Sequence, residues 1–143
     1  MSDPDPRLSP VVPVLVAALV CDVAVADPAT GKKNLIGIFD RLWAADFPTT
    51  RPLSLYWKIT DAEGYYKISA RFVQLNGSMV LGEAMGDLTI QDRLSSADFM
   101  LPFPPVPFPQ PGRYEFQILM NDVLLGSAIV DANLRPDSPD PER

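Results

Sequence analysis

The sequence predicts an all-β protein, built as a sandwich of about seven antiparallel strands. Apolar and polar residues alternate with a period of two over most of the chain, the spacing of a strand with one buried face. Gly, Pro and Asn residues separate these segments at short intervals, as turns between strands require. The 3.6-residue apolar period of an ordinary helix is absent almost everywhere. Short strands with such turns are typical of a β-sandwich.

The first strand is expected over Val14–Val25, where β-branched valine favours extended backbone. Asp3 and Asp5 precede this stretch, which is the wrong charge for a signal peptide. Asp22 interrupts it, and it is shorter than the ~20 apolar residues of a membrane-spanning helix. We therefore expect a cytoplasmic protein with no membrane insertion.

Four strands follow in the middle of the chain. A polar loop leads into a predicted strand over Leu35–Trp43. A hairpin is expected next, with strands over 53–60 and 66–72 joined by the turn residues 61–64. Asn76-Gly77 then marks a tight turn into a strand over Met79–Ile90. The inward side chains of the hairpin are expected to be Leu53, Leu55, Trp57, Ile59, Tyr66, Ile68, Ala70 and Phe72.

The last two strands form a second predicted hairpin, in which Tyr114–Met120 turns at Asn121-Asp122 into Val123–Val130. Two residues favour an immunoglobulin-like arrangement of the seven strands. Trp57 points inward, where that fold keeps a core tryptophan, and Tyr114 follows Pro111-Gly112 as a tyrosine corner would. A jelly roll or another eight-stranded sandwich is the alternative, if Phe99–Phe103 also pairs.

The most unusual segment is Leu101–Gly112, which contains six prolines. Proline fixes φ and lacks an N–H, so this segment cannot be a central strand and is expected to run as polyproline II. We interpret it as a crossover between the sheets, with Phe103, Val106 and Phe108 packed down. The alternative is an exposed docking surface formed by the same three residues.

Both chain ends are rich in Asp, Pro and Ser. Residues 1–11 and 134–143 have little to bury and are expected to be disordered tails. The sandwich domain is then expected over residues 12–133.

The composition removes most catalytic chemistry. The 143 residues include no histidine and a single cysteine, Cys21, which excludes a His-based triad, a His-containing zinc site and a disulfide framework. The net charge of −6 argues against nucleic acid as a partner. Asp22 and Asp40 could approach one another, but calcium needs six to eight oxygens, usually from one dense loop. We therefore expect no enzyme activity, no cofactor and no metal.

Three stretches carry a family resemblance: Cys21-Asp22, the ten residues from Gly31 to Asp40 (GKKNLIGIFD), and the six from Pro111 to Phe116 (PGRYEF). With these motifs the chain resembles a family of small bacterial proteins of unknown function, over about residues 17–130. The resemblance implies a stand-alone β-sandwich and assigns no site residues.

We hypothesise an interaction or structural module that binds itself or another protein. Both faces of the first strand are apolar, so one face is expected to meet a second copy. Leu15 lies on one of these faces and Val16 on the other, and either residue could belong to the contact. The alternative is a small-ligand or carbohydrate-binding domain that uses a surface pair of tyrosines, Tyr56 and Tyr65.

A chelator tests the expected absence of a metal. EDTA should leave the melting temperature unchanged, because no bound ion contributes to folding. A decrease of several degrees in a thermal melt would restore the Asp22/Asp40 site.

Overall fold

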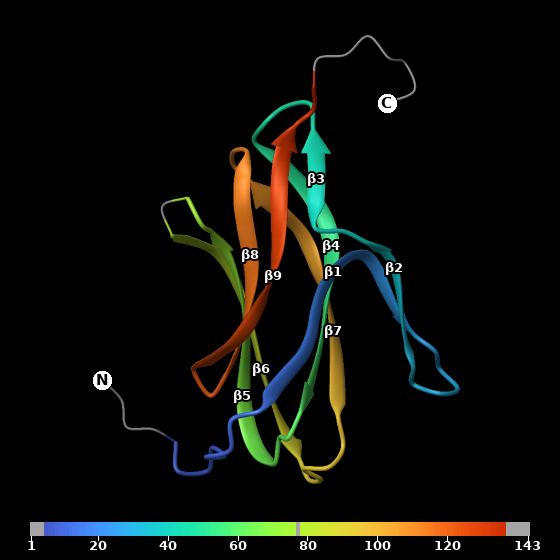
Figure 1. The fold of residues 1–143 in the computed structure, drawn as a ribbon, viewed down its shortest axis with the longest axis vertical. Coiled ribbons are helices and arrows are strands. Elements are labelled where there is room, and N and C mark those ends of the chain that lie inside the picture. The colour runs from blue at the N-terminus through green and yellow to red at the C-terminus, as the bar shows by residue number, and fades with distance from the viewer. Residues whose placement is uncertain (1–4, 77, 137–143) are drawn as a thin grey trace.

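The computed structural model describes residues 5–76 and 78–136, which form two packed β-sheets (Figure 1). One sheet has four strands in the order β2-β1-β4-β7, and the other has five in the order β3-β9-β8-β5-β6. The all-β prediction is confirmed. The strands are β1 (Val14–Ala26), β2 (Lys33–Ile38), β3 (Arg41–Ala44), β4 (Thr49–Thr60), β5 (Gly64–Gln74), β6 (Met79–Ile90), β7 (Ala97–Phe108), β8 (Gly112–Met120) and β9 (Val123–Leu134).

The predicted strand over Leu35–Trp43 is in fact two strands in different sheets. β2 pairs with β1, the chain leaves the sheet at Phe39 and Asp40, and β3 pairs with β9. The Asp40 carbonyl accepts a hydrogen bond from the Asp131 N–H, which starts the second pairing. The prediction of a purely antiparallel sandwich is therefore wrong at this point, because β3 runs parallel to β9.

The proline-rich segment is a strand, so the prediction of a polyproline II crossover is wrong. β7 pairs with β4 over its whole length and is the last strand of its sheet. Proline is tolerated there because an edge strand has a neighbour on one side only. Pro104 and Pro105 together face the single residue Pro52, which forms a bulge.

The core follows the predicted alternation. The side chains of Leu53, Leu55, Trp57 and Ile59 on β4 are all buried. Aromatic rings of both sheets fill one end of the sandwich, where Phe72 of β5 packs on Phe108, Tyr114 and Phe116 at centroid distances of 4.7–5.5 Å. Toward the other end, Trp57 stacks on Phe99 at 5.3 Å.

The predicted turn at Asn121-Asp122 is confirmed, since both residues have positive φ, 51° and 64°, as a tight hairpin turn requires. The Asn76-Gly77 turn includes Gly77, which lies outside the described residues.

The described residues of the N-terminal segment contact β5. Leu8 forms an isolated parallel bridge with Tyr65, and the Ser9 N–H donates to the Tyr65 carbonyl at 2.9 Å. The Tyr66 hydroxyl donates to the Val11 carbonyl. The described part of the N-terminal segment therefore lies against β5. β9 extends to Leu134, and residues 137–143 of the predicted C-terminal tail are outside the described range.

Tyr114 makes the backbone contact expected of a tyrosine corner. Its ring is fully buried, and its hydroxyl donates to the carbonyl of Gln110 at 2.5 Å, four residues upstream. The same hydroxyl accepts the Gln110 N–H at 3.2 Å. Burial raises the pKa of the Tyr114 hydroxyl, so it stays protonated as a donor. The bond fixes the crossing from β7 to β8.

Tyr114→Phe should destabilise the protein by about 1–3 kcal/mol, because the Gln110 carbonyl and N–H both lose a buried partner. A thermal melt should show a decrease of about 3–10 °C. Tyr65→Phe is the matched control, since its hydroxyl bonds Asp87 at the surface and should cost little. Equal melting temperatures for wild type and Tyr114→Phe would contradict the corner.

Candidate functional site

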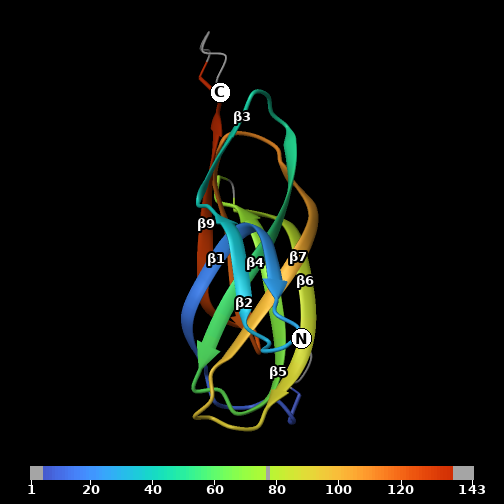
Figure 2. The same ribbon diagram turned by 90° about the vertical axis from the view of Figure 1, so that its right-hand side faces the viewer.

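The most distinctive surface feature is a hairpin that leaves the four-stranded sheet. β1 pairs with β4 from Val14 to Cys21, and from Cys21 to Ala26 it pairs with β2 instead. We call the paired segments Cys21–Ala26 and Lys33–Ile38 the β1–β2 hairpin. Figures 1 and 2 show that it bends away from the first half of β1 and runs back along the sheet toward β7.

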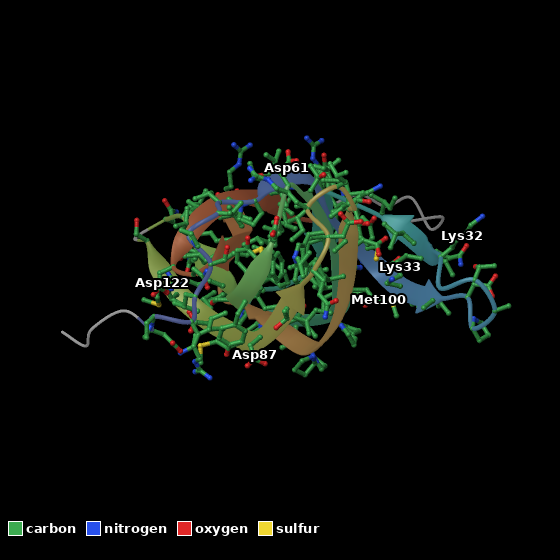
Figure 3. The ribbon with its side chains drawn as sticks, turned by 90° about the horizontal axis from the view of Figure 1, so that it is seen from below. Lys32, Lys33, Asp61, Asp87, Met100 and Asp122 are labelled. Carbon is green, nitrogen blue, oxygen red and sulfur yellow. The ribbon has the colours of Figure 1, made fainter. Side chains whose placement is uncertain are left out.

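An ion pair holds the tip of the hairpin. Lys33 Nζ lies 3.0 Å from Asp98 Oδ1 of β7, and the Tyr56 hydroxyl of β4 donates to Asp98 Oδ2 at 3.0 Å. In Figure 3 Lys33 lies near Met100 of β7, whereas Lys32 points outward. The carboxylate thus joins three strands, β2, β4 and β7.

The environment of Asp98 favours its charged form. Burial raises the pKa of its carboxyl, but hydrogen bonds from Lys33 and Tyr56 and the charges of Lys33 and Lys58 outweigh burial and lower the pKa below its usual value. The carboxylate therefore stays ionised, and the ion pair intact, over the whole neutral range.

Cys21 marks the bend of β1 and has a structural environment. The residue is fully buried, and its thiol lies 3.7 Å from the Ser54 carbonyl of β4 and 3.4 Å from the Val23 carbonyl. Burial and the charge of Asp22 raise the pKa of the thiol, which disfavours a reactive thiolate.

The hairpin has two unlike faces. Ala24 and Leu35, which lie opposite one another, are half-buried. The other face is exposed and aliphatic. We call it the hairpin face; it consists of Val23, Val25, Ile36 and Ile38, each 46–59% exposed. Asn34 pairs with Val25 on this face, so no charged residue interrupts it.

The predicted docking residues of the proline-rich segment lie inside the sandwich. Phe108 is fully buried and Val106 is 6% exposed, while Phe103 packs on Phe116 at 5.2 Å. The side chains that β7 exposes are the prolines: Pro102, Pro104, Pro105 and Pro107. The alternative of a docking surface built from Phe103, Val106 and Phe108 is therefore wrong.

Leu15 and Val16 lie on opposite faces of β1, and a register shift decides that Leu15 lies on the inner face. Leu15 packs against the core beside Gly126 of β9, where a Cβ would lie only 2.6 Å from Leu15 Cδ2. Val16 is 54% exposed. The register shifts between Leu15 and Ala17, so that Leu15 shares the inner face with Ala18 and Val20.

The other candidate groups are not brought together. Tyr56 lies on β4 and Tyr65 on β5, in different sheets, and their hydroxyls bond Asp98 and Asp87 respectively. This placement excludes the predicted tyrosine pair. Within residues 5–76 and 78–136, no three His, Cys, Asp or Glu side chains cluster as metal ligands would. The same residues contain no helix long and apolar enough to cross a membrane.

Comparison with known proteins identifies the family. The model of the family of unknown function DUF6941 matches residues 16–131. The chain belongs to this family. No curated protein matches the DUF6941 chain. Among solved structures, it is similar to the Pseudomonas fluorescens alkylpurine DNA glycosylase AlkC bound to DNA containing an abasic site analog, at 11% identity and a TM-score of 0.46. That match covers 81% of this chain and 30% of the glycosylase.

Sequence reasoning missed the hairpin face. Its signal was present in Val23 and Val25, which alternate with small or polar residues, and in Ile36 and Ile38, which do the same around Gly37. The bend at Cys21 hides the signal, because β1 reads as one continuous buried strand.

Asp98→Asn should loosen the hairpin, because a neutral amide cannot hold Lys33. Amide hydrogen exchange over residues 23–26 and 33–38 should accelerate roughly threefold to tenfold. Asp87→Asn, which removes the negative charge beside the Tyr65 hydroxyl in the other sheet, is the control and should leave these amides unchanged.

The same opening is expected in the wild-type protein at low pH. The pKa of Asp98 is lowered in the folded state. The ion pair therefore stabilises the hairpin fully above the usual Asp pKa of about 3.9, and this stabilisation is lost as pH falls through the lowered value. Exchange in the hairpin that is insensitive to both the substitution and acid would contradict the ion pair's role.

Proposed function

We propose that this protein is a non-catalytic β-sandwich module that self-associates through the hairpin face. The observation that carries the proposal is the exposure of four aliphatic side chains, Val23, Val25, Ile36 and Ile38, on one uncharged surface. Apolar patches of a few hundred Å² on soluble proteins commonly mark contacts with other proteins.

A second copy of the chain is the partner that suits this surface. β2 is the first strand of its sheet and pairs with β1 only, so its other edge offers free backbone N–H and C=O groups. Two copies related by a two-fold axis can pair β2 with β2 and bring Ile36 and Ile38 of both copies together.

Two features support the non-catalytic part of the proposal. The chain has no histidine, and its one thiol, Cys21, is buried with a raised pKa. The acidic composition supports a protein partner in preference to nucleic acid, and we propose a cytoplasmic location with no membrane insertion.

We also infer an immunoglobulin-like relationship for the sandwich. The neighbours β9-β8-β5 correspond to strands G, F and C of that fold, and the β4–β7 pair corresponds to B and E. The Tyr114 hydroxyl bond to Gln110 at the β7–β8 crossing supports the correspondence. Trp57 departs from it, since this tryptophan lies on β4 and not on the strand equivalent to C.

Sedimentation equilibrium at micromolar concentration tests self-association. We expect a mass of two or more chains for the wild type and of one chain for Ile36→Glu, because a buried unpaired carboxylate opposes the contact. Val16→Glu is the matched control, an equally exposed aliphatic residue on the first half of β1. It should remain associated.

Two results would overturn the proposal. A single-chain mass at every wild-type concentration excludes self-association. Dissociation by Val16→Glu and not by Ile36→Glu places the contact away from the hairpin. Far-UV circular dichroism checks that each variant is folded.

A further inference from the structure

β6 leaves one backbone edge of the five-stranded sheet without a neighbour. It is the last strand of that sheet, and among the described residues it pairs with β5 alone. Its sequence, MVLGEAMGDLTI, has no proline and no lysine, the residues that most often protect an edge strand. β7, the edge strand of the other sheet, carries four prolines instead. β6 therefore offers a twelve-residue edge that is open to pairing.

The hydrogen bonds of β5 show which of its backbone groups face β6. The carbonyls of Tyr65 and Lys67 accept bonds from the N–H groups of Ser9 and Asn121, on the side of β5 away from β6. Successive residues of a strand direct their N–H and C=O groups to opposite sides. The even-numbered residues of β5 therefore bond to β6.

The same alternation identifies the free backbone groups of β6. Ile68 of β5 lies opposite Gly86, and Ala70 lies opposite Ala84, so Gly86 and Ala84 use their N–H and C=O groups in the ladder with β5. The residues that alternate with them direct these groups away from the sheet. They are Glu83, Met85 and Asp87.

The side chains of these three residues lie on the outer face of β6. Met85 is 79% exposed. Arg71 Nε lies 2.9 Å from Glu83 Oε2, and the Tyr65 hydroxyl donates to Asp87 Oδ2 at 2.8 Å, both from β5. No hydrogen bond from the described residues reaches the second oxygen of either carboxylate. The edge thus presents two acidic groups, one on each side of an exposed methionine.

A second copy of β6 is a poor partner for this edge. The strand contains two acidic residues, Glu83 and Asp87, and no basic residue. Pairing β6 with β6 would bring the carboxylates of both copies onto one face of the joined sheet, with no base on either edge strand. Like charges on adjacent strands are destabilising, whereas opposite charges stabilise the pair. The charge of the edge therefore favours a strand that carries Lys or Arg on its outer face.

The inner face of the edge favours apolar side chains. Ala84 and Gly86 of β6 and Phe99 and Leu101 of β7 line a cavity of about 210 Å³ between the two sheets, on the side where both strands are edges. No ionisable residue lines this cavity. A strand added to β6 would direct every second side chain to the inner face, where burial of an apolar group is favourable.

We propose that the free edge of β6 is a docking site for an extended segment of another protein, with basic residues at alternate positions and apolar residues between them. The segment adds an antiparallel strand to the five-stranded sheet, the pairing that is more stable per residue. Its basic side chains pair with Glu83 and Asp87, and its apolar side chains cover the cavity. This contact is separate from the hairpin face, because β2 and β6 end different sheets.

A short peptide tests the edge directly. The acetylated and amidated sequence Ser-Thr-Lys-Val-Thr-Val-Lys-Thr-Ser places its lysines opposite Glu83 and Asp87 and its valines on the inner face. The Ile36→Glu protein is used, so that association through the hairpin face does not contribute. The peptide should bind saturably. In ¹H–¹⁵N spectra it should slow amide exchange of Glu83, Met85 and Asp87 about tenfold at saturation, since only these N–H groups gain acceptors.

Three altered peptides are the matched controls. Glutamate in place of both lysines should weaken binding about tenfold at low ionic strength, because it opposes Glu83 and Asp87. An N-methyl group on the central threonine should weaken binding by about tenfold or more, because it removes a bond to β6. The same group on the next valine points away from β6 and should have little effect.

Met85→Pro tests the edge from the side of the protein. It removes an N–H that is free in the sheet and none of the bonds to β5, which an edge strand tolerates. Peptide binding should be lost, whereas Met85→Leu, which keeps the N–H, should retain it. If Met85→Pro does not fold, the N-methylated peptides test the same bonds.

Four results would overturn the proposal. Absence of saturable binding up to about 1 mM peptide excludes a docking site for this pattern. Equal binding of the glutamate peptide removes the basic partner. Equal or reversed effects of the two N-methyl groups exclude antiparallel strand addition. Protection of the Glu83, Met85 and Asp87 amides that rises with protein concentration, without peptide, assigns the edge to a second copy.

Discussion

The missing N–H groups of the β7 prolines are the constraint on which the rest of the sandwich depends. A strand with Pro102, Pro104, Pro105 and Pro107 cannot donate along two ladders, so β7 can be bonded on one side only, to β4. The sheet therefore ends at β7. The same residues protect the free edge, since a proline-rich edge is a poor template for pairing with another chain. Buried and exposed side chains still alternate along β7, so that Val106 and Phe108 lie in the core and the prolines between them are exposed.

A sheet that ends at β7 makes the two sides of the sandwich unequal. On one side β1 packs beside β9, and Leu15 fits only because Gly126 has no side chain. On the other side β6 and β7 are both edges, and the short residues of β5 and β6 leave the cavity beside Trp57. The free hairpin face also follows from β1, which pairs with β4 only as far as Cys21.

The alternation of apolar and polar residues and the turn residues were sufficient to predict features that depend on neighbours in the sequence. Alternation identified the buried face of β4. The position of Tyr114 after Pro111-Gly112 predicted a hydroxyl bond to upstream backbone, and the structure shows that the acceptor is the Gln110 carbonyl. These local features did not predict which strands pair, because strand pairing depends on residues distant in the sequence. Leu35–Trp43 reads as one strand, yet Phe39 and Asp40 carry the chain from one sheet to the other. At the candidate site, alternation tells which residues share a face but not what covers that face. The register shift after Leu15, the bend at Cys21 and the reach of Lys33 to Asp98 all depend on residues distant in sequence.

β7 links the β1–β2 hairpin to the core of the sandwich. Asp98 and Phe99 are consecutive, so their side chains leave the strand in opposite directions. Asp98 faces outward and holds Lys33 of the hairpin, while Phe99 faces inward and stacks on Trp57 at the cavity. Because β7 is hydrogen-bonded on one side only, its position depends on β4, on these two contacts and on the packing of Phe103, Val106 and Phe108 in the core. The prolines that confine β7 to the edge thus determine both where the hairpin rests and where the sandwich stays open.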